Sequence, residues 1–273
     1  MEQPDTKIVI PHEWEVLIQG IKRFDGIAKV FILGGMDTGK TALALYLANT
    51  LSRFSKTALI DTDPGQSVVG PPSTAGLLVF NEQTRRQNFQ EDLVLTAMPL
   101  KPNLMTFVGS TTPAGNLVQA IVGAKKLLEA AIRLRPGYIV INSSGMVFGD
   151  MAMEFKFQKM DLISPTHIIA LERERELTPI LKNFYGRRFV SIVRLKIAEA
   201  VTEKTQAQRF AYRSRAFASY FMNPDRLILP LRTLGLHGRI PDFRAKEAWT
   251  NLLIGLCDSR TFTRSLGVIH NTA

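Results

Sequence analysis

The sequence predicts an α/β fold in which a mostly parallel sheet carries helices on both of its faces. Apolar strands alternate along the chain with segments of helical periodicity, and most of these strands are continuous apolar runs. Such runs are typical of strands in a parallel sheet, because helices cover both sides of it. With 273 residues, of which 45% are hydrophobic, the chain is long enough to bury a large core. We therefore expect one domain over residues 1–273.

A glycine-rich loop follows the apolar strand 30–33 and is the most specific signal in the chain. Residues 34–41 read Gly-Gly-Met-Asp-Thr-Gly-Lys-Thr and fit the phosphate-cradling P-loop pattern G-x-x-x-x-G-K-[ST]. Backbone N–H groups at the start of the next helix would point at anionic oxygens. Lys40 would reach the β- and γ-phosphates, and the Thr41 hydroxyl would hold a magnesium ion.

This loop predicts a fold of the P-loop NTPase type with ATP and Mg²⁺ as cofactors. The expected nucleotide site consists of Gly34, Gly35, Met36, Asp37, Thr38, Gly39, Lys40, Thr41 and Ala42. Adenine is the expected base by elimination, because the chain has no Asn-Lys-x-Asp motif of the guanine-specific switch proteins.

Two carboxylates follow the next strand. The apolar run 58–60 delivers Asp61 and Asp63 as it enters a Pro-Gly turn. Carboxylates at the carboxyl end of a strand beside a P-loop are placed to hold magnesium or to accept a proton. An ordinary acidic turn is the alternative interpretation, and the adjacent P-loop favours the functional one.

The other elements follow from periodicity and from glycine and proline punctuation. A helix is expected from about residue 10 to 24, with Trp14 on its packed face. Further strands are expected at 77–80, 93–98, 105–108, 138–142, 167–171 and 189–193. Further helices are expected at 117–134, 150–160 and 177–184. Residues 196–221 are basic and helical in period, and 252–269 read as a terminal β-hairpin.

The positive charge of the chain lies beyond the P-loop half. The formal net charge is +10. Residues 1–170 hold 16 Lys and Arg against 15 Asp and Glu, whereas residues 171–273 hold 18 against 9. A basic surface on one part of a nucleotide-binding protein indicates contacts with a phosphate backbone. We divide the domain into a nucleotide-binding core (26–194), a basic lid or helical region (195–250) and a terminal hairpin packed on the core (251–270).

Composition disfavours several other classes of protein. The single Cys257 excludes an internal disulfide, so a reducing, cytoplasmic setting is expected. No apolar run reaches membrane-spanning length, and we expect no membrane association. Four scattered histidines and one cysteine offer no zinc-like cluster.

Several of these motifs together resemble the polynucleotide 5′-hydroxyl kinase family. That family includes the kinase subunit of the pre-mRNA cleavage machinery and the kinase that acts in ribosomal RNA spacer processing. The resemblance covers nearly all of residues 10–270. It rests on Pro11-x-Glu13-Trp14, the P-loop with its internal Asp37, Asp61-x-Asp63-x-Gly65-Gln66, Gly109-Ser110-Thr111-Thr112-Pro113, Asn142-Ser143-Ser144-Gly145 and Arg209-x-x-x-Arg213.

The chain departs from the family pattern in two ways. Larger members carry extra domains on both sides of the kinase core, and we expect this chain to consist of the core alone. A loop that commonly reads Thr-x-Gly-Trp in the family reads Ser143-Ser144-Gly145-Met146 here. A methionine packs against a nucleic-acid base but stacks less well than tryptophan.

The resemblance implies transfer of the γ-phosphate of ATP to the 5′-hydroxyl of RNA or DNA. Lys40 would hold the donor phosphates, while Thr41 and Asp61, directly or through water, would hold magnesium. Asp63 is the preferred base and Asp37 the alternative. The lid arginines that would close over the transferring phosphate are Arg209 and Arg213. The candidates for contacts with the terminal nucleotides are Gln66, Thr112, Pro113, Ser143 and Gly145.

Two other functions remain open at this point. The chain could bind ATP as a structural ligand in an assembly and transfer nothing, or it could phosphorylate a small hydroxylated metabolite. The intact Lys40, Thr41, Asp61 and Asp63 favour catalysis over structural binding. The positive balance beyond residue 171 favours a polyanionic acceptor over a small metabolite.

Overall fold

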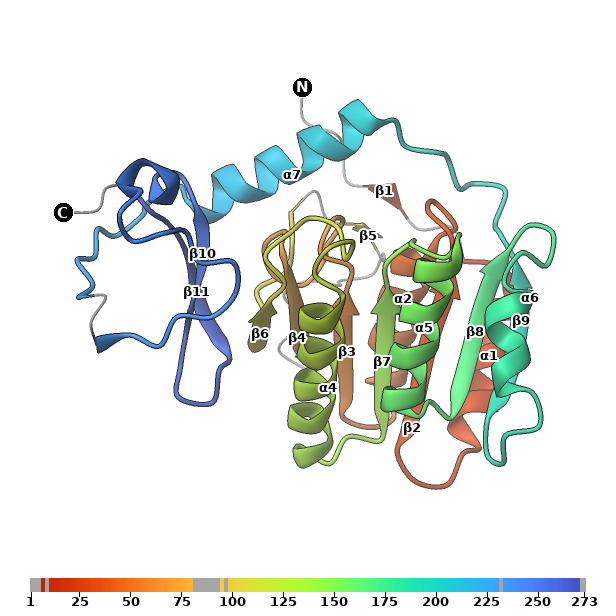
Figure 1. The fold of residues 1–273 in the computed structure, drawn as a ribbon. Coiled ribbons are helices and arrows are strands. Elements are labelled where there is room, and N and C mark those ends of the chain that lie inside the picture. The colour runs from red at the N-terminus through yellow and green to blue at the C-terminus, as the bar shows by residue number, and fades with distance from the viewer. Residues whose placement is uncertain (1–5, 8–9, 81–93, 96–97, 231–232, 271–273) are drawn as a thin grey trace.

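A nine-stranded mixed sheet forms the centre of the protein (Figure 1). The computed structural model describes residues 6–7, 10–80, 94–95, 98–230 and 233–270. The strand order in the sheet is β10-β11-β6-β4-β3-β7-β2-β8-β9. These strands are β2 (Ala28–Gly34), β3 (Thr57–Thr62), β4 (Thr74–Phe80), β6 (Leu104–Phe107), β7 (Tyr138–Ser143), β8 (His167–Glu172), β9 (Ser191–Lys196), β10 (Leu253–Cys257) and β11 (Thr263–Val268).

The half of the sheet that carries the P-loop is parallel, as the sequence predicts. The strands β3, β7, β2, β8 and β9 pair in parallel, with β2 between β7 and β8. Parallel neighbours need long crossover connections, and helices supply them here. As a result, the carboxyl ends of β2, β3 and β7 lie at the same edge of the sheet (Figure 1). The predicted site residues follow these strands in the sequence.

The other half of the sheet is antiparallel. We did not expect this, because the strands and helices alternate along the sequence. The strand β4 pairs antiparallel with β3 and with β6. Between β3 and β4 the chain runs through residues 63–73 without a helix, so it turns back beside the strand it has just left. Half of the predicted strand at 93–98 lies outside the described residues. Its described part, β5 (Val94–Leu95), pairs with β1 (Thr6–Lys7).

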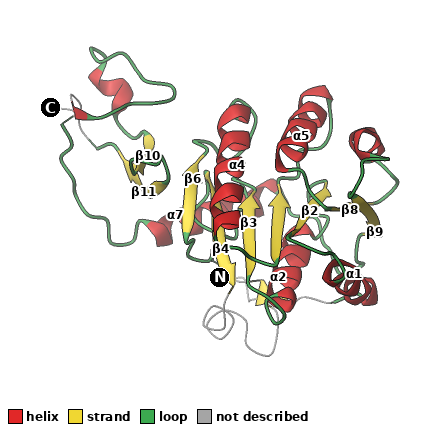
Figure 2. Cartoon of the chain, turned by 90° about the horizontal axis from the view of Figure 1, so that it is seen from below, coloured by secondary structure: helices red, strands yellow, loops and turns green. Residues whose placement is uncertain are grey.

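Helices cover both faces of the sheet, as predicted (Figure 2). One face carries α1 (His12–Lys22) and α2 (Lys40–Leu51), and the other carries α4 (Leu117–Arg133), α5 (Asp150–Ile163) and the short α6 (Thr178–Leu181). On α1 the packed face is the predicted one, since Trp14 and its helical neighbours Leu17, Ile18 and Ile21 are buried. Two hydrophobic cores, one on each side of the sheet, result.

A helix lies across the carboxyl ends of the parallel strands (Figure 1). This helix, α7 (Gln206–Tyr220), is shorter than the predicted segment 196–221, since a capping box between Thr205 and Gln208 fixes its first turn. At its other end the Tyr220 hydroxyl accepts a hydrogen bond of 2.9 Å from the Leu266 amide of β11.

The predicted terminal hairpin is present as β10 and β11, which pair antiparallel. It joins the central sheet where Thr263 of β11 pairs with Met105 of β6. A Cβ on Gly255 would lie 2.8 Å from the side chain of Phe107, so β10 packs closely over that strand only because this residue is glycine.

Candidate active site

The P-loop connects β2 to α2 and surrounds the ammonium group of Lys40. Its glycines are needed for space as well as for turning, because a Cβ on Gly34 would lie 2.6 Å from the Thr38 hydroxyl. Gly39 has a positive φ of 85°, which glycine adopts without strain. The Lys40 side chain is buried, and its ammonium group donates to the Gly35 carbonyl and, over 3.4 Å, to the Thr38 hydroxyl. The predicted phosphate cation therefore sits inside the loop.

Burial lowers the pKa of Lys40 to about 8, although the charges of Asp63 and Asp37 oppose that shift. The lowered pKa means that the protein solvates this ammonium group poorly. An anionic oxygen bound in the loop would supply the missing charge, and hydrogen bonds from a cation to phosphate are among the strong ones. The electrostatics of Lys40 thus fit the phosphates of a nucleotide.

The two acids after β3 have different surroundings. Asp61 is fully buried, and both of its carboxylate oxygens accept hydrogen bonds. Its Oδ1 accepts from the Asp63 amide (3.1 Å) and from Asn142 Nδ2 (3.0 Å). Its Oδ2 accepts from the Val68 amide (2.6 Å) and from Ser67 Oγ (3.4 Å). Burial and the neighbouring Asp63 raise the pKa of Asp61 to about 6.

Asp63 is half-buried and is held by its own turn. Its Oδ1 accepts hydrogen bonds from the amides of Gly65 (3.0 Å) and Gln66 (3.3 Å). The carboxylate therefore has a fixed position at the end of β3, close enough to influence the charge of Lys40. A fixed, partly accessible carboxylate is suited to accept a proton.

Asn142, at the end of β7, links the predicted metal ligands and was missed as a site residue. Its Nδ2 donates to Asp61 Oδ1 and lies 3.5 Å from Thr41 Oγ1. Its Oδ1 is buried and has no hydrogen-bond partner within the described residues. In the same ranges, His, Cys, Asp and Glu side chains do not gather in threes as an all-protein metal site. Oxygen donors of this kind fit Mg²⁺, which keeps several water or phosphate ligands.

Asp37 and Arg209 connect the P-loop to α7. The Arg209 guanidinium forms an ion pair with Asp37, which also accepts a 3.0 Å hydrogen bond from the Lys204 amide. On the next turn, the Tyr212 hydroxyl donates to the Ser67 carbonyl over 2.6 Å. The predicted lid helix is therefore attached to both sides of the site. Arg213 is half-buried, and it makes no hydrogen bond or ion pair with any residue of the described ranges.

Two close backbone approaches bring the predicted nucleic-acid loops to the site. A Cβ on Gly65 would lie 2.5 Å from the Thr111 carbonyl, so the 109–113 loop stands against the turn after Asp63. A Cβ on Gly145 would lie 2.7 Å from the Met36 side chain and 2.8 Å from its backbone, so the 143–146 loop stands against the P-loop. Glycine is required at both contacts.

The side chains on these loops are not equally accessible. Gln66 is half-buried and Thr112 is exposed, whereas Pro113 and Ser143 are buried. The Ser143 hydroxyl donates to the Ile32 carbonyl over 2.7 Å and ties β7 to β2. Beside the P-loop, the side chains of Met36 and Phe148 are exposed, and sequence analysis did not single out Phe148.

Sequence analysis also missed Lys156 and Lys159 of α5, which are almost completely buried beneath the site. Burial lowers the pKa of Lys159 to about 8, although the charges of Asp63 and Asp61 oppose that shift. Burial also lowers the pKa of Lys156, and the charges of Lys159 and Lys40 act in the same direction.

The burial of Lys159 predicts an unusual dependence of folding stability on pH. Between pH 8 and 10.5 the unfolded chain binds more protons at Lys159 than the folded chain does, so stability increases with pH in that window. From the pKa difference, we expect the free energy of unfolding of the wild type to rise by up to about 3 kcal/mol relative to Lys159→Met. Denaturant titrations of both proteins across this window measure the difference. Parallel curves would contradict the burial of a charged lysine.

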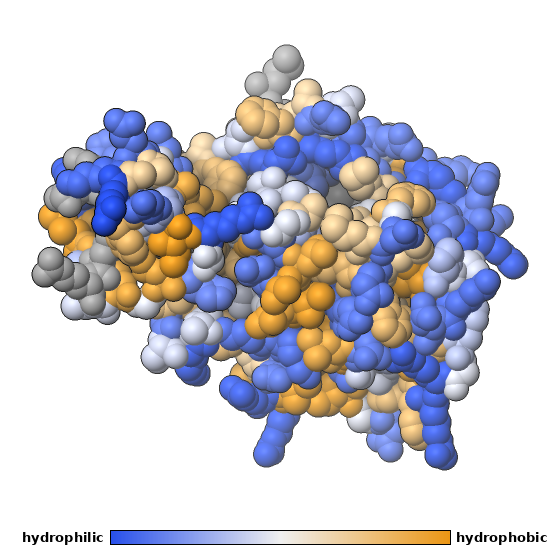
Figure 3. All heavy atoms as spheres, viewed as in Figure 1, coloured by the Kyte–Doolittle hydropathy of each residue, from blue (hydrophilic) through white to orange (hydrophobic). Residues whose placement is uncertain are grey.

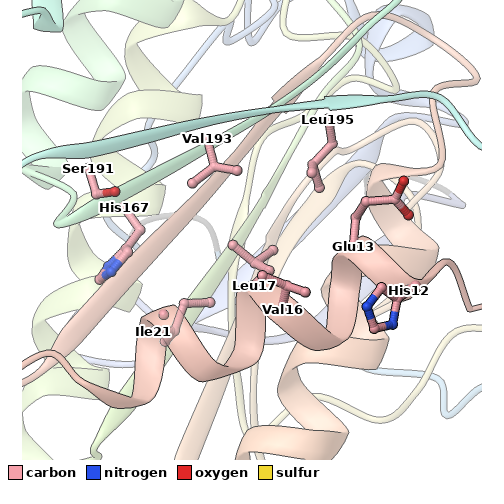
Figure 4. A pocket seen from close by; sticks show the side chains of 10 residues that line it. His12, Glu13, Val16, Leu17, Ile21, His167, Ser191, Val193 and Leu195 are labelled. Atoms are coloured by element: carbon pink, nitrogen blue, oxygen red, sulfur yellow. The ribbon is translucent and has the colours of Figure 1, made fainter.

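Two apolar features lie away from the P-loop. A pocket of about 430 Å³ lies between α1 and the edge strand β9, where Val193 and Leu195 face Leu17 (Figure 4). It contains none of the predicted site residues. Apolar side chains also gather over α4, where Val118 and Val122 are exposed (Figure 3). Neither feature includes a residue of the P-loop or of the turn after β3.

Comparison with known proteins shows the family of the chain. Residues 34–223 match the family model of the mRNA cleavage and polyadenylation factor CLP1 P-loop. The polyribonucleotide 5′-hydroxyl-kinase of Pyrococcus furiosus is 32% identical over 216 residues, which is 78% of this chain and 56% of that protein. The enzyme of the same name from Methanocaldococcus jannaschii is 34% identical over 215 residues, again 78% of this chain and 56% of the relative.

The fold has solved counterparts as well. The structure of a wild-type Clp1p–Pcf11p complex superposes with a TM-score of 0.58 at 16% identity, covering 80% of this chain and 55% of that one. The chain thus spans little more than half the length of the curated relatives it matches. None of the helices in the described ranges has the length and apolar character that a membrane crossing requires. With the family model matching residues 34–223, from the P-loop to just beyond α7, the chain belongs to the CLP1 P-loop family.

Proposed function

We propose that this chain is an ATP- and Mg²⁺-dependent polynucleotide 5′-hydroxyl kinase of RNA or DNA, acting in the cytoplasm in RNA processing or repair. The observation that carries the proposal is the joint placement of Lys40 and Asp63. The carboxylate of Asp63, fixed by the Gly65 amide, raises the pKa of the buried Lys40 ammonium group against the effect of burial. The names of the relatives support the polynucleotide acceptor.

Phosphoryl transfer depends mainly on positioning and charge, which divides the work among these residues. Asp63 takes the proton of the 5′-hydroxyl while that oxygen bonds to the γ-phosphorus and the bond to the leaving ADP breaks. Lys40 and the P-loop amides hold the donor phosphates. We assign the base to Asp63 and not to Asp37, because Asp37 is engaged by Arg209 and by the Lys204 amide.

Thr41 and Asp61 would hold Mg²⁺ next to Asn142. When bound there, the ion offsets the charge that develops on the β- and γ-phosphate oxygens. Because both oxygens of Asp61 already accept hydrogen bonds, we infer that this carboxylate acts through a water ligand. Burial raises the pKa of Asp61 to about 6, and a nearby cation would favour its ionised form.

Arg209 and Arg213 of α7 act as the lid. Arg213 lies one turn beyond Arg209 on α7, half-buried and without a partner in the described ranges, so it has a free guanidinium for the transferring phosphate. Arg209 anchors the helix to Asp37 and adds its charge to the same region. The polynucleotide end would enter between Gln66, Thr112 and the backbone of Ser143 and Gly145, with Met36 and Phe148 offering apolar surface to a base.

The two alternative functions, an ATP-binding assembly protein and a metabolite kinase, differ from a polynucleotide kinase in whether a phosphate acceptor binds and in its size. An assembly protein would bind ATP and transfer nothing. A metabolite kinase would not need the basic segment, whose Arg239 lies 3.7 Å from the position of a Cβ on Gly115 in the loop after Pro113. Label transfer from γ-labelled ATP to RNA, DNA and small hydroxylated compounds separates the three functions.

Binding of a single-stranded oligonucleotide should weaken steeply with salt. Each phosphate that the basic region neutralises releases counterions, so we expect a slope of about −0.7 per contacted phosphate in a log–log plot. Fluorescence anisotropy over a range of salt concentrations measures it. Arg239→Ala should make the slope shallower and lower affinity for all sequences alike. Binding that ignores salt would refute the polynucleotide acceptor and favour the metabolite kinase.

A further inference from the structure

Two lysines of α5 are buried directly beneath the proposed acceptor side. Lys156 and Lys159 are three residues apart, so they lie on one face of the helix. Their exposed fractions are 0% and 1%. Fully buried lysines are rare unless they are paired with an acid. Here the hydrogen-bond partners of both ammonium groups, within the described residues, are neutral oxygens.

Each lysine holds a different segment of the site. Lys156 Nζ donates to the Ser144 carbonyl and, over 3.2 Å, to the Ser144 hydroxyl. Lys159 Nζ donates over 2.9 Å to the hydroxyl of Thr62, which lies between Asp61 and Asp63 and itself donates to the Asn142 carbonyl. The two ammonium groups therefore contact the segment that carries the proposed base and the loop that stands against the P-loop.

The contact with Ser144 fixes the direction of a backbone donor. In a trans peptide the C=O and the following N–H point in opposite directions. Because Lys156 turns the Ser144 carbonyl toward α5, the Gly145 N–H points away from the helix. Gly145 packs against Met36 of the P-loop, so this donor belongs to the surface where donor and acceptor substrates would meet. A polynucleotide end offers anionic oxygens to such a donor.

Packing alone does not account for these charges. Burying an ammonium group without an acid is unfavourable by several kcal/mol, and a hydrophobic residue of similar size is often neutral or stabilising in its place. The pair also adds its charge to that of Lys40, against the acids Asp61 and Asp63. Burial lowers the pKa of all three lysines, so an incoming anion would favour their protonated forms.

We propose that Lys156 and Lys159 are positioning residues for the polynucleotide acceptor. Lys156 orients the Ser144–Gly145 peptide so that its N–H receives an anionic oxygen of the acceptor, and Lys159 holds Thr62 so that Asp63 meets the 5′-hydroxyl. The proposal rests on the proposed kinase function and deepens it. It assigns to α5 a part in acceptor binding that is separate from the binding of ATP.

Lys156→Met and Lys159→Met test the proposal by steady-state kinetics with both substrates and by thermal melting at neutral pH. We expect kcat/KM for a 5′-hydroxyl oligonucleotide to fall by about tenfold or more in each variant. The KM for ATP should stay within about threefold of the wild type, and the melting temperature should be unchanged or higher. If a methionine variant does not fold, Lys156→Gln or Lys159→Gln, which keeps a polar side chain, replaces it.

Lys29→Met is the matched control. Lys29 is half-buried at the start of β2, far along the strand from the P-loop, and its Nζ donates over 3.0 Å to the neutral Ile163 carbonyl. This variant should keep the kinetic constants of the wild type toward both substrates.

Two outcomes would overturn the inference alone. Wild-type kinetics in both methionine variants would show that the lysines do not act on the acceptor. A lower melting temperature with equal losses toward both substrates would show that they only support the fold. A wild-type chain that transfers no phosphate would refute the proposed function and this inference with it.

Discussion

Lys40→Ala should abolish phosphoryl transfer and weaken ATP binding. The variant removes a buried ammonium group that sits within the loop 34–41, where the donor phosphates would bind. Loss of a cation at a transferring phosphate lowers the rate by about a thousandfold or more. ATP affinity should also fall, because this charge acts on the bound nucleotide before the reaction as well as during it. Single-turnover transfer and calorimetric ATP titration measure the two effects.

Lys29→Ala is a control for the loss of a lysine from the same strand–loop–helix unit. Its ammonium group binds the Ile163 carbonyl at the other end of β2, so transfer and ATP affinity should remain those of the wild type. Wild-type transfer by Lys40→Ala would remove the P-loop from the mechanism.

Asp63→Asn should lower the rate of transfer by about a hundredfold to ten-thousandfold, the usual contribution of a general base. Asparagine keeps the shape of the side chain, and its carbonyl oxygen still accepts the hydrogen bonds from the Gly65 and Gln66 amides. It cannot accept the proton of the 5′-hydroxyl. ATP affinity should therefore change little, since the acid acts on the acceptor and not on the donor phosphates.

Asp61→Asn and Asp37→Asn separate the base from the neighbouring acids. Asp61→Asn should change the magnesium dependence of transfer, and Asp37→Asn should loosen the contact of α7 with the P-loop by releasing Arg209. Rates at saturating and limiting magnesium distinguish the three variants. If Asp61→Asn is the variant that lowers only the rate, while Asp63→Asn alters magnesium dependence, the two roles are reversed.

Local signals in the sequence were sufficient for the nucleotide half of the protein. The strand, the P-loop and α2 are adjacent in the chain, and their geometry depends on glycines whose positions the motif itself specifies. The sequence also indicated that Asp61 and Asp63 lie beside the P-loop. They follow a buried strand, and the carboxyl ends of parallel strands meet at one edge of the sheet.

Contacts between segments that are distant in the sequence could not be predicted from local motifs. Asp37 and Arg209 are 172 residues apart, and their pairing depends on where α7 crosses the sheet. The antiparallel β4 depends on the loop after Asp63, which turns back instead of forming a crossover helix. In each case the outcome is set by tertiary packing, for which residue spacing gives no signal.

The burial of the two lysines of α5 is the clearest example of a contact that the sequence did not predict. A lysine in a helix is usually on a solvated face, and nothing in the sequence around Lys156 and Lys159 indicates otherwise. They are buried because that face of α5 packs beneath Ser144 and Thr62. Asn142 is similar, since its role depends on β7 lying beside β3, which brings its amide to Asp61.

The most direct test of the kinase function is the transfer of label from γ-labelled ATP to a 5′-hydroxyl RNA in the presence of magnesium. The same RNA carrying a 5′-phosphate is the matched acceptor control, and Lys40→Ala is the matched protein control. We predict label on the 5′-hydroxyl RNA alone, released as a 5′-labelled nucleotide after nuclease digestion, and none with Lys40→Ala. ATP binding without label on 5′-hydroxyl RNA or DNA would contradict the kinase function.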